Sequence, residues 1–200
     1  MSARNPLLQE FLTSVAEVFS TIAVGPETAD AIDRIHDALQ ASGRAGSDTA
    51  KRLKVCEHLG CALAATRAAS PPLARVADAF AALEPLLCWT RRPASGPFAS
   101  DNWPEGHANA TIVGPGGLEA REDLVIGVSL LAPHVRYPDH NHSPEEVYLV
   151  LSPGRFQHGK SDWFEPGIGG TLYNEPNIVH AMASGEAPLL ALWYLWVGRS

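Results

Sequence analysis

Two histidines and two glutamates lie within twelve residues between Tyr137 and Tyr148, a stretch that reads YPDHNHSPEEVY. A third histidine, His180, follows in a second short segment, NEPNIVHAM. Imidazole nitrogens and carboxylate oxygens bind divalent transition metals, and a site with few protein ligands leaves coordination positions open for a substrate. The residues therefore predict a catalytic metal site.

A competing explanation is that the histidines of the HNH stretch are exposed loop residues and that Glu146 is a solvated strand residue. Alternation of side chains along a strand favours the metal site, because it places Glu146 and Tyr148 on one face and the intervening apolar residues on the other. His140 and His142 also stand two residues apart, although a Ser-Pro pair separates them from Glu146. Taken together with His180, the cluster favours a metal ion.

The elements that must position these residues change in character near residue 90. Before it, apolar residues recur at helical spacing, and the pattern predicts four helices: near the N-terminus, after Pro26, over about 48–69 and over about 72–88. Beyond it, short apolar runs between Gly and Pro residues predict strands over 124–131, 146–151 and 189–197. We therefore expect an α+β protein, with a helical region over 1–95 and a β domain over 96–200.

About one hundred residues of short antiparallel strands must hide their edges, and a small barrel or jelly roll is the simplest way to do so. The interior of that barrel is the expected site. The helical region lacks a basic recognition helix, so it is expected to cover the barrel, shield the pocket or form a homodimer contact.

Composition excludes other classes of partner. The net charge of −7 and the scattered Lys and Arg residues leave no basic face for nucleic acid, and no apolar run is long enough for a membrane span. The N-terminal segment is typical of an amphipathic helix and not of a signal peptide, so cytoplasmic residence is expected. A small-molecule substrate is the predicted partner.

Two motifs carry a family resemblance. HNHSPEEVYLVLSPG resembles the first cupin motif, and GTLYNEPNIVH resembles the second. More narrowly, the YPxHxH opening, the pair Glu146-x-Tyr148, the spacing to His180 and the helical N-terminal extension resemble the Q-type cupin lyases that cleave dimethylsulfoniopropionate (DMSP). The second motif departs from the general cupin pattern, because Pro176 lies close to His180 and no glycine lies between them.

The resemblance implies a C-terminal cupin β-barrel that holds one divalent transition metal ion, which could be Fe, Zn, Mn, Co or Ni. It implies that His142, Glu146 and His180 bind this ion and that His140 lies in or beside the coordination sphere. It also implies a β-elimination that yields dimethyl sulfide and acrylate. A proton α to a carboxylate is weakly acidic, so this reaction needs a cation on the carboxylate and a positioned base.

Tyr148 is the first choice for the base, because a nearby divalent ion favours the phenolate. Tyr137 could donate a hydrogen bond to the substrate carboxylate, share the role of base, or simply fill the pocket. A sulfonium group suits aromatic faces, but the sequence assigns none of its aromatic residues to that role. His107, His134 and His158 are expected in surface or loop positions and not as ligands.

Two other functions remain open at this point. A cupin dioxygenase or isomerase could use the same ligands with a different substrate. A non-catalytic cupin module could bind a small molecule without turning it over.

Overall fold

The computed structural model describes residues 3–46, 49–92 and 96–198. Its helices are α1 (Pro6–Thr21), α2 (Pro26–Leu39), α3 (Leu59–Ala69), α4 (Pro71–Leu83) and the short α5 (Trp103–Gly106), with 3-10 turns at Lys54–His58 and Glu84–Leu86. Its strands are β1 (Arg44–Ala45), β2 (His107–Val113), β3 (Glu119–Ala120), β4 (Leu124–Leu131), β5 (Glu145–Val150), β6 (Arg155–His158), β7 (Thr171–Asn174), β8 (His180–Ala183) and β9 (Leu189–Trp196).

Local sequence signals explain where the helices begin. The Asn5 side chain accepts hydrogen bonds from the first turn of α1, and the Ser70 hydroxyl accepts one from the N–H of Leu73 in α4. Three of the helices begin at a proline, whose missing N–H costs nothing at that position. Four long helices lie where four were predicted, but the last, predicted over about 72–88, ends at Leu83 and is followed by a 3-10 turn.

The helix predicted over about 48–69 is shorter than expected. Asp48 lies outside the described residues, and α3 begins only at Leu59, after a 3-10 turn. Lys51 instead forms a parallel backbone bridge with Cys88, so the chain at Lys51 is extended and not helical.

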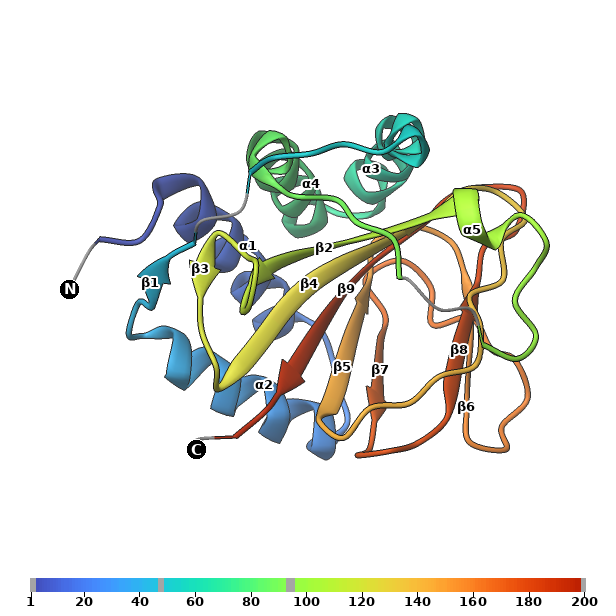
Figure 1. Ribbon diagram of the computed structural model, residues 1–200. Coiled ribbons are helices and arrows are strands. Elements are labelled where there is room, and N and C mark those ends of the chain that lie inside the picture. The colour runs from blue at the N-terminus through green and yellow to red at the C-terminus, as the bar shows by residue number, and fades with distance from the viewer. Residues whose placement is uncertain (1–2, 47–48, 93–95, 199–200) are drawn as a thin grey trace.

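Two β-sheets contain the strands of the second half of the chain together with β1. The larger has the order β1-β3-β2-β4-β9-β5-β7, and the smaller pairs β6 with β8. Figure 1 shows the long strands β2, β4 and β9 crossing the molecule and the β6-β8 pair set apart at one side. The α+β class and the C-terminal jelly-roll barrel predicted from the sequence are confirmed.

Two buried clusters separate the faces of the large sheet. The outer face packs against the helices and includes Val147 and Leu149, whereas Tyr148 and Val150 belong to the cluster between the two sheets. The alternation predicted for this strand is therefore confirmed. Helices α2 and α3 contact strands of the large sheet directly, so the helical region covers that side of the barrel.

Strand pairing and side-chain bonds connect the helical region to the β domain. Strand β1, from the helical region, pairs with β3, and the buried Arg4 side chain bonds both Glu119 and the carbonyl oxygen of Leu39. The predicted boundary at residue 95 lies outside the described residues. The division into 1–95 and 96–200 stays a prediction. One hydrophobic cluster contains buried residues of both regions.

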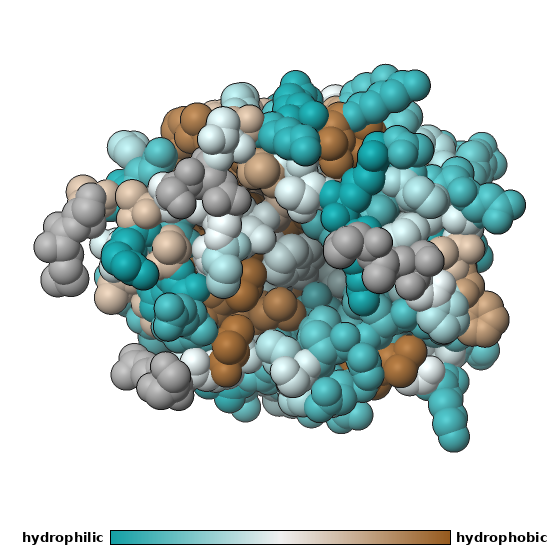
Figure 2. Space-filling model, in the orientation of Figure 1, coloured by the Kyte–Doolittle hydropathy of each residue, from teal (hydrophilic) through white to brown (hydrophobic). Residues whose placement is uncertain are grey.

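The face shown in Figure 2 is mainly hydrophilic. The face in Figure 2 carries only separate hydrophobic patches, and the exposed large apolar side chains of the described residues are scattered through the sequence: Leu7, Leu86, Phe98, Val179 and Val197. None of the described helices is both long enough and apolar enough to span a membrane.

The ion pair between Arg4 and Glu119 predicts an acid dependence of stability. Burial by itself raises the pKa of Glu119, but hydrogen bonds from Arg4 and from the N–H of Gly43 outweigh burial and hold that pKa below its ordinary value. A depressed pKa means that the carboxylate stabilises the fold fully above the unfolded pKa of about 4.3 and that this contribution is lost as the pH falls through the lower folded pKa.

We expect the free energy of unfolding to fall more steeply with decreasing pH in the wild type than in Glu119→Gln, as measured by urea denaturation between about pH 3 and pH 6. The exposed Glu10 provides a matched control, because Glu10→Gln should keep the wild-type slope. Identical slopes in Glu119→Gln and the wild type would contradict the prediction.

Candidate functional site

A cavity of about 140 Å³ lies between the two sheets. The large sheet contributes Glu146 and Tyr148 of β5, Trp193 and Leu195 of β9, Ser129 of β4 and Asn109 of β2, and the remaining lining residues are Tyr137, His140, His142 and Met182. Strand alternation turns Glu146 and Tyr148 of β5 toward this cavity, as predicted. The site therefore lies in the barrel interior.

Backbone pairing brings the distant histidine to the motif. The N–H of His140 donates to the carbonyl of His180 at 3.1 Å, and the N–H of His180 donates to the carbonyl of His140 at 2.9 Å. This reciprocal pair joins the segment before β5 to the start of β8. The predicted association of the two motifs is thus a consequence of sheet pairing.

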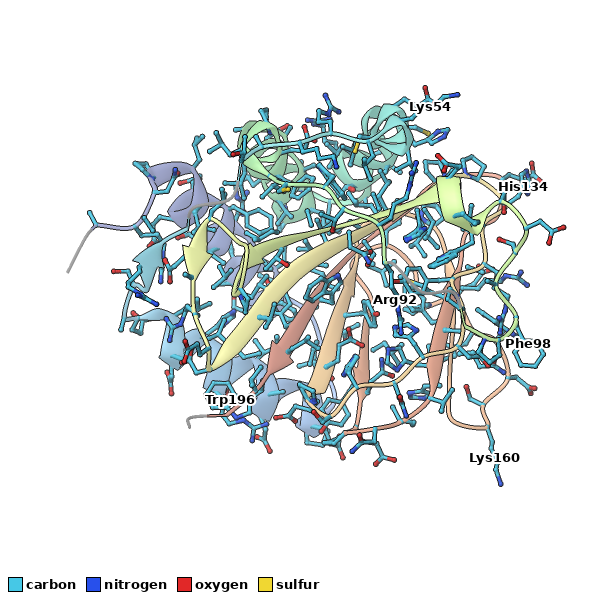
Figure 3. All side chains as sticks on the ribbon, in the orientation of Figure 1. Lys54, Arg92, Phe98, His134, Lys160 and Trp196 are labelled. Atoms are coloured by element: carbon cyan, nitrogen blue, oxygen red, sulfur yellow. The ribbon has the colours of Figure 1, made fainter. Side chains whose placement is uncertain are left out.

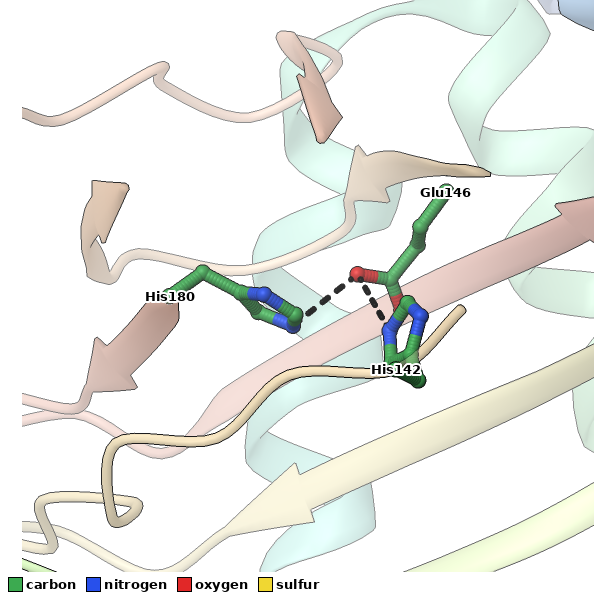
Figure 4. A group of neighbouring side chains, drawn as sticks. All are labelled: His142, Glu146 and His180. Atoms are coloured by element: carbon green, nitrogen blue, oxygen red, sulfur yellow. Dashed lines mark ion pairs between the residues drawn. The ribbon is translucent and has the colours of Figure 1, made fainter. Parts of the chain in front are cut away.

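The three predicted ligands His142, Glu146 and His180 meet at one point (Figure 4). Glu146 Oε2 lies 3.4 Å from His142 Nε2 and 3.2 Å from His180 Nε2. Within the described residues, one ligand atom from each of the three falls inside a span of 4.8 Å. Metal–ligand bonds of about 2.0–2.2 Å would connect such atoms to a single ion.

The backbone fixes the tautomer of each imidazole. His140, His142 and His180 place Nδ1 at 2.9, 2.9 and 3.0 Å from the carbonyl oxygens of Pro138, Pro144 and Ile178. A carbonyl oxygen only accepts, so Nδ1 carries the proton and the neutral ring keeps its lone pair on Nε2. This is the arrangement that histidine ligands of metals commonly show.

The donor set therefore fits a divalent transition metal. The buried Nε2 atoms of His142 and His180 have no hydrogen-bond partner, which is costly unless another group binds them. Two imidazoles and one carboxylate are a known metal-binding set that leaves coordination positions open. The cluster of converging ligand atoms consists of His142, Glu146 and His180 and does not include His140.

Burial and charge pairing shift the pKa values of these groups in the metal-free protein. Burial by itself raises the pKa of Glu146, but pairing with His142 and His180 lowers it to about 2. Burial lowers the pKa of His140 to about 3, and the charge of His180 adds to the effect. For His142, burial lowers the pKa, but pairing with Glu146 outweighs it and raises the pKa. His140 is thus neutral at physiological pH, and its ring centroid is 4.1 Å from that of His180.

Asn174 of β7 holds the carboxylate in place. Its Nδ2 donates to Glu146 Oε2 at 3.0 Å, and the Asn174 side chain is fully buried. Behind it, His158 Nδ1 lies 3.3 Å from Asn174 Oδ1. Sheet pairing sets this contact, because Glu146 lies opposite Asn174 in the register of β5 and β7.

The two predicted tyrosines line the same cavity from different segments. Tyr148 is buried beside Glu146 on β5. Burial, followed by the negative charge of Glu146, raises the pKa of Tyr148 well above its ordinary value. Tyr137 lies on the loop before the HNH stretch, and its hydroxyl accepts a hydrogen bond of 3.0 Å from Asn109. The structure brings both residues to the site, and their roles stay predictions.

Sequence reasoning missed several residues of the site. Asn109 and Ser129 line the cavity, and Arg92, labelled in Figure 3, places its guanidinium carbon 6.0 Å from the centre of the Tyr137 ring. Ser129 gave a usable signal, because it is the single polar residue in the apolar run LVIGVSLL. Arg92 and Asn109 gave none, because their positions depend on strand pairing.

The other histidines do not join the ligand group. His134 is exposed, as expected, but the surface or loop position predicted for His107 is wrong. His107 is fully buried on β2 and stacks on Trp103 at 4.1 Å, with Nδ1 against the Trp103 carbonyl and Nε2 accepting from the N–H of Arg92. His158 is half-buried on β6, where it contacts Asn174.

Among the aromatic residues left unassigned by sequence, Trp193 is the one that lines the cavity. Tyr194 faces the opposite way, into the cluster shared with the helices. The Tyr173 hydroxyl donates to Glu145, away from the cavity. Strand alternation along β9 explains why Trp193 and Tyr194 point to different cores.

Comparison with known proteins gives the family. The profile of the dimethylsulfoniopropionate lyase family matches residues 27–191. DddL of Cereibacter sphaeroides, named as a candidate DMSP lyase, is 29% identical over 92 residues, which are 46% of this chain and 39% of that protein. The chain therefore matches well under half of the length of this curated relative.

Two solved structures share the fold. DMSP lyase DddQ from Ruegeria pomeroyi DSS-3 has a TM-score of 0.68 and 19% identity, covering 96% of this chain and 92% of that one. A chain from the crystal structures of the DMSP lyases RdDddP and RnDddQII has a TM-score of 0.71 and 22% identity, covering 95% and 92%. These likenesses concern the fold, whereas the profile match spans most of the sequence. The chain belongs to the dimethylsulfoniopropionate lyase family.

Proposed function

We propose that this protein cleaves DMSP to dimethyl sulfide and acrylate, using one divalent transition metal ion held by His142, Glu146 and His180. One observation carries the proposal. The Nε2 atoms of His142 and His180, which have no hydrogen-bond partner, converge with the Glu146 carboxylate beside a small cavity that Tyr148 also lines. Membership of the lyase family supports this choice of substrate.

The reaction is a β-elimination that needs no redox partner. A base takes one proton from the carbon α to the carboxylate, and the C–H electron pair forms the Cα=Cβ double bond. The Cβ–S bond breaks, and its electron pair leaves with sulfur as neutral dimethyl sulfide. Acrylate and one proton are the other products, so atoms and charges balance.

Tyr148 is the proposed base. It is buried beside Glu146, and both residues face the cavity from β5. Burial and the charge of Glu146 disfavour its phenolate in the protein alone. A bound divalent cation would supply the positive charge that favours the phenolate and that stabilises the enolate-like charge on the substrate.

Other residues would bind and orient the substrate. The Trp193 side chain forms an aromatic wall of the cavity, which suits a sulfonium group that cannot donate hydrogen bonds. The Tyr137 hydroxyl and the positive charge of Arg92, which lies near the Tyr137 ring, both suit the substrate carboxylate. His140, which is neutral, is proposed to lie in or beside the coordination sphere of the metal, next to His180.

The first test is production of dimethyl sulfide. Protein reconstituted separately with Fe, Zn, Mn, Co or Ni should release it from DMSP, as measured by headspace gas chromatography. His180→Ala should lose both bound metal and activity, because it removes a buried ligand. His134→Ala is the matched control, since His134 is exposed and outside the cavity. Silence of the wild type with every metal would refute the proposal.

Tyr148→Phe separates chemistry from metal binding. The variant should keep its metal content, measured by elemental analysis, but lose roughly 10²- to 10⁴-fold in kcat, the usual contribution of a general base. Tyr173→Phe is the control, because the Tyr173 hydroxyl bonds Glu145 outside the cavity. Full activity in Tyr148→Phe would show that another group is the base.

Asn174→Leu tests the support of Glu146. The change removes the N–H that holds the carboxylate, and loss of such a supporting contact typically weakens metal binding by about 10- to 100-fold. Isothermal titration with Zn²⁺ or Mn²⁺ measures this directly. Asn102→Leu, which alters a surface amide, should bind metal like the wild type. Unchanged affinity in a folded Asn174→Leu protein, as judged by circular dichroism, would contradict the prediction.

A further inference from the structure

Four side chains form a continuous chain of hydrogen bonds that runs along the cavity wall away from β5. Trp193 Nε1 donates to Ser129 Oγ at 3.1 Å, Ser129 Oγ donates to Asn109 Oδ1 at 2.8 Å, and Asn109 Nδ2 donates to the Tyr137 hydroxyl at 3.0 Å. The four residues come from β9, β4, β2 and the loop before the HNH stretch. They all line the same cavity.

The chemistry of the first member sets the direction of the whole chain. An indole N–H can only donate, so Ser129 Oγ must accept from it. The Ser129 hydroxyl proton is then free to bond Asn109, which must offer its carbonyl oxygen. The Asn109 amide nitrogen therefore faces Tyr137. Each orientation follows from the one before it.

The Trp193 ring is fixed by a second, independent feature. Gly127 lies opposite Trp193 in the register of β4 and β9. A Cβ at Gly127 would come within 2.1 Å of Trp193 Cζ2, so only a glycine leaves room for the ring to lie across the strand. The bond to Ser129 and the space above Gly127 hold the indole in one position.

The chain ends at a phenol whose own proton is unused. The Tyr137 oxygen accepts from Asn109, and among the described residues no acceptor takes the Tyr137 hydroxyl proton. Edge contacts with Trp103 and His107, at centroid distances of 5.9 and 5.6 Å, hold the ring in place. A hydroxyl held this way offers one donor to whatever occupies the cavity.

We propose that Asn109, supported by Ser129 and Trp193, is a positioning residue that turns the hydroxyl proton of Tyr137 into the cavity, where it donates to the carboxylate of the substrate. This inference rests on the proposed function for the identity of the substrate. It assigns Tyr137 to binding of the carboxylate and leaves proton removal to Tyr148. Asn109 acts through Tyr137, so its effect must vanish when that hydroxyl is absent.

A double-mutant cycle tests this dependence. Asn109→Leu and Tyr137→Phe should each raise KM for DMSP by roughly 10-fold or more, the usual scale for a hydrogen bond to a charged group, with a smaller change in kcat. The double variant should be no worse than Tyr137→Phe alone. Ser129→Ala releases the amide and should have a smaller effect in the same direction, again absent when Tyr137 is Phe.

Thr111→Val is the matched control. Thr111 lies two residues from Asn109 on β2 but does not line the cavity, so its loss should leave KM unchanged. Circular dichroism and metal content exclude misfolded variants, and Ser129→Ala keeps the test informative if Asn109→Leu does not fold. Multiplicative losses in the double variant, or a wild-type KM in Asn109→Leu, would overturn the inference.

Binding of acrylate distinguishes this inference from the proposed function. Calorimetry on metal-loaded protein needs no turnover, and acrylate keeps the carboxylate of the substrate. Its Kd should rise by a similar factor in Asn109→Leu and no further in the double variant. An active wild type with independent Asn109 and Tyr137 effects refutes the positioning role alone. Failure of the wild type to bind acrylate counts against the role assigned to Tyr137, and absence of dimethyl sulfide counts against the lyase.

Discussion

Burial of the Glu146 carboxylate is the constraint around which the site is built. A charged carboxylate inside a protein is unstable unless other groups compensate it. Here Asn174 donates a hydrogen bond to Glu146, and the divalent ion proposed between Glu146, His142 and His180 would balance the charge. The register between β5 and β7 and the backbone bridge at β8 bring these groups together. The strand arrangement is therefore the condition under which this carboxylate can stay ionised.

The same barrel interior separates two kinds of chemistry. Glu146 and the imidazoles offer a carboxylate and lone pairs, whereas the adjoining part of the cavity offers donors and an aromatic face through Tyr137 and Trp193. The proposed substrate, which has an anionic end and a cationic end, would use both. Helices α2 and α3 contribute indirectly, because they cover the outer face of the large sheet and bury its apolar side chains.

The sequence predicted the parts of this arrangement that depend on local pattern. The strand expected over 124–131 coincides with β4. The side-chain alternation predicted for β5 is also correct, because Glu146 and Tyr148 point inward. Side-chain period and ligand type are local properties, so one sequence suffices to predict them. The extended segment near Lys51 and the burial of His107 were missed, because each depends on a partner far away in the sequence.

Asn109 and Asn174 show the same limit within the site. An isolated asparagine in a strand is equally compatible with a solvent-facing residue, and only strand register places these two against Tyr137 and Glu146. Register between distant strands cannot be derived from periodicity alone. The ligands could thus be predicted from sequence, but the residues that orient them could not.

The carbonyl-anchored imidazoles have a consequence for how the protein acquires its ion. Because backbone oxygens already hold Nδ1 of His142 and His180, little rotational freedom is left to lose when an ion arrives. Such a site would lose nearly the same small amount of side-chain entropy with each of the related ions. The intrinsic affinities would then follow the general order of the divalent metals. Which metal occupies it in a cell would then be decided by cellular availability as much as by the fold.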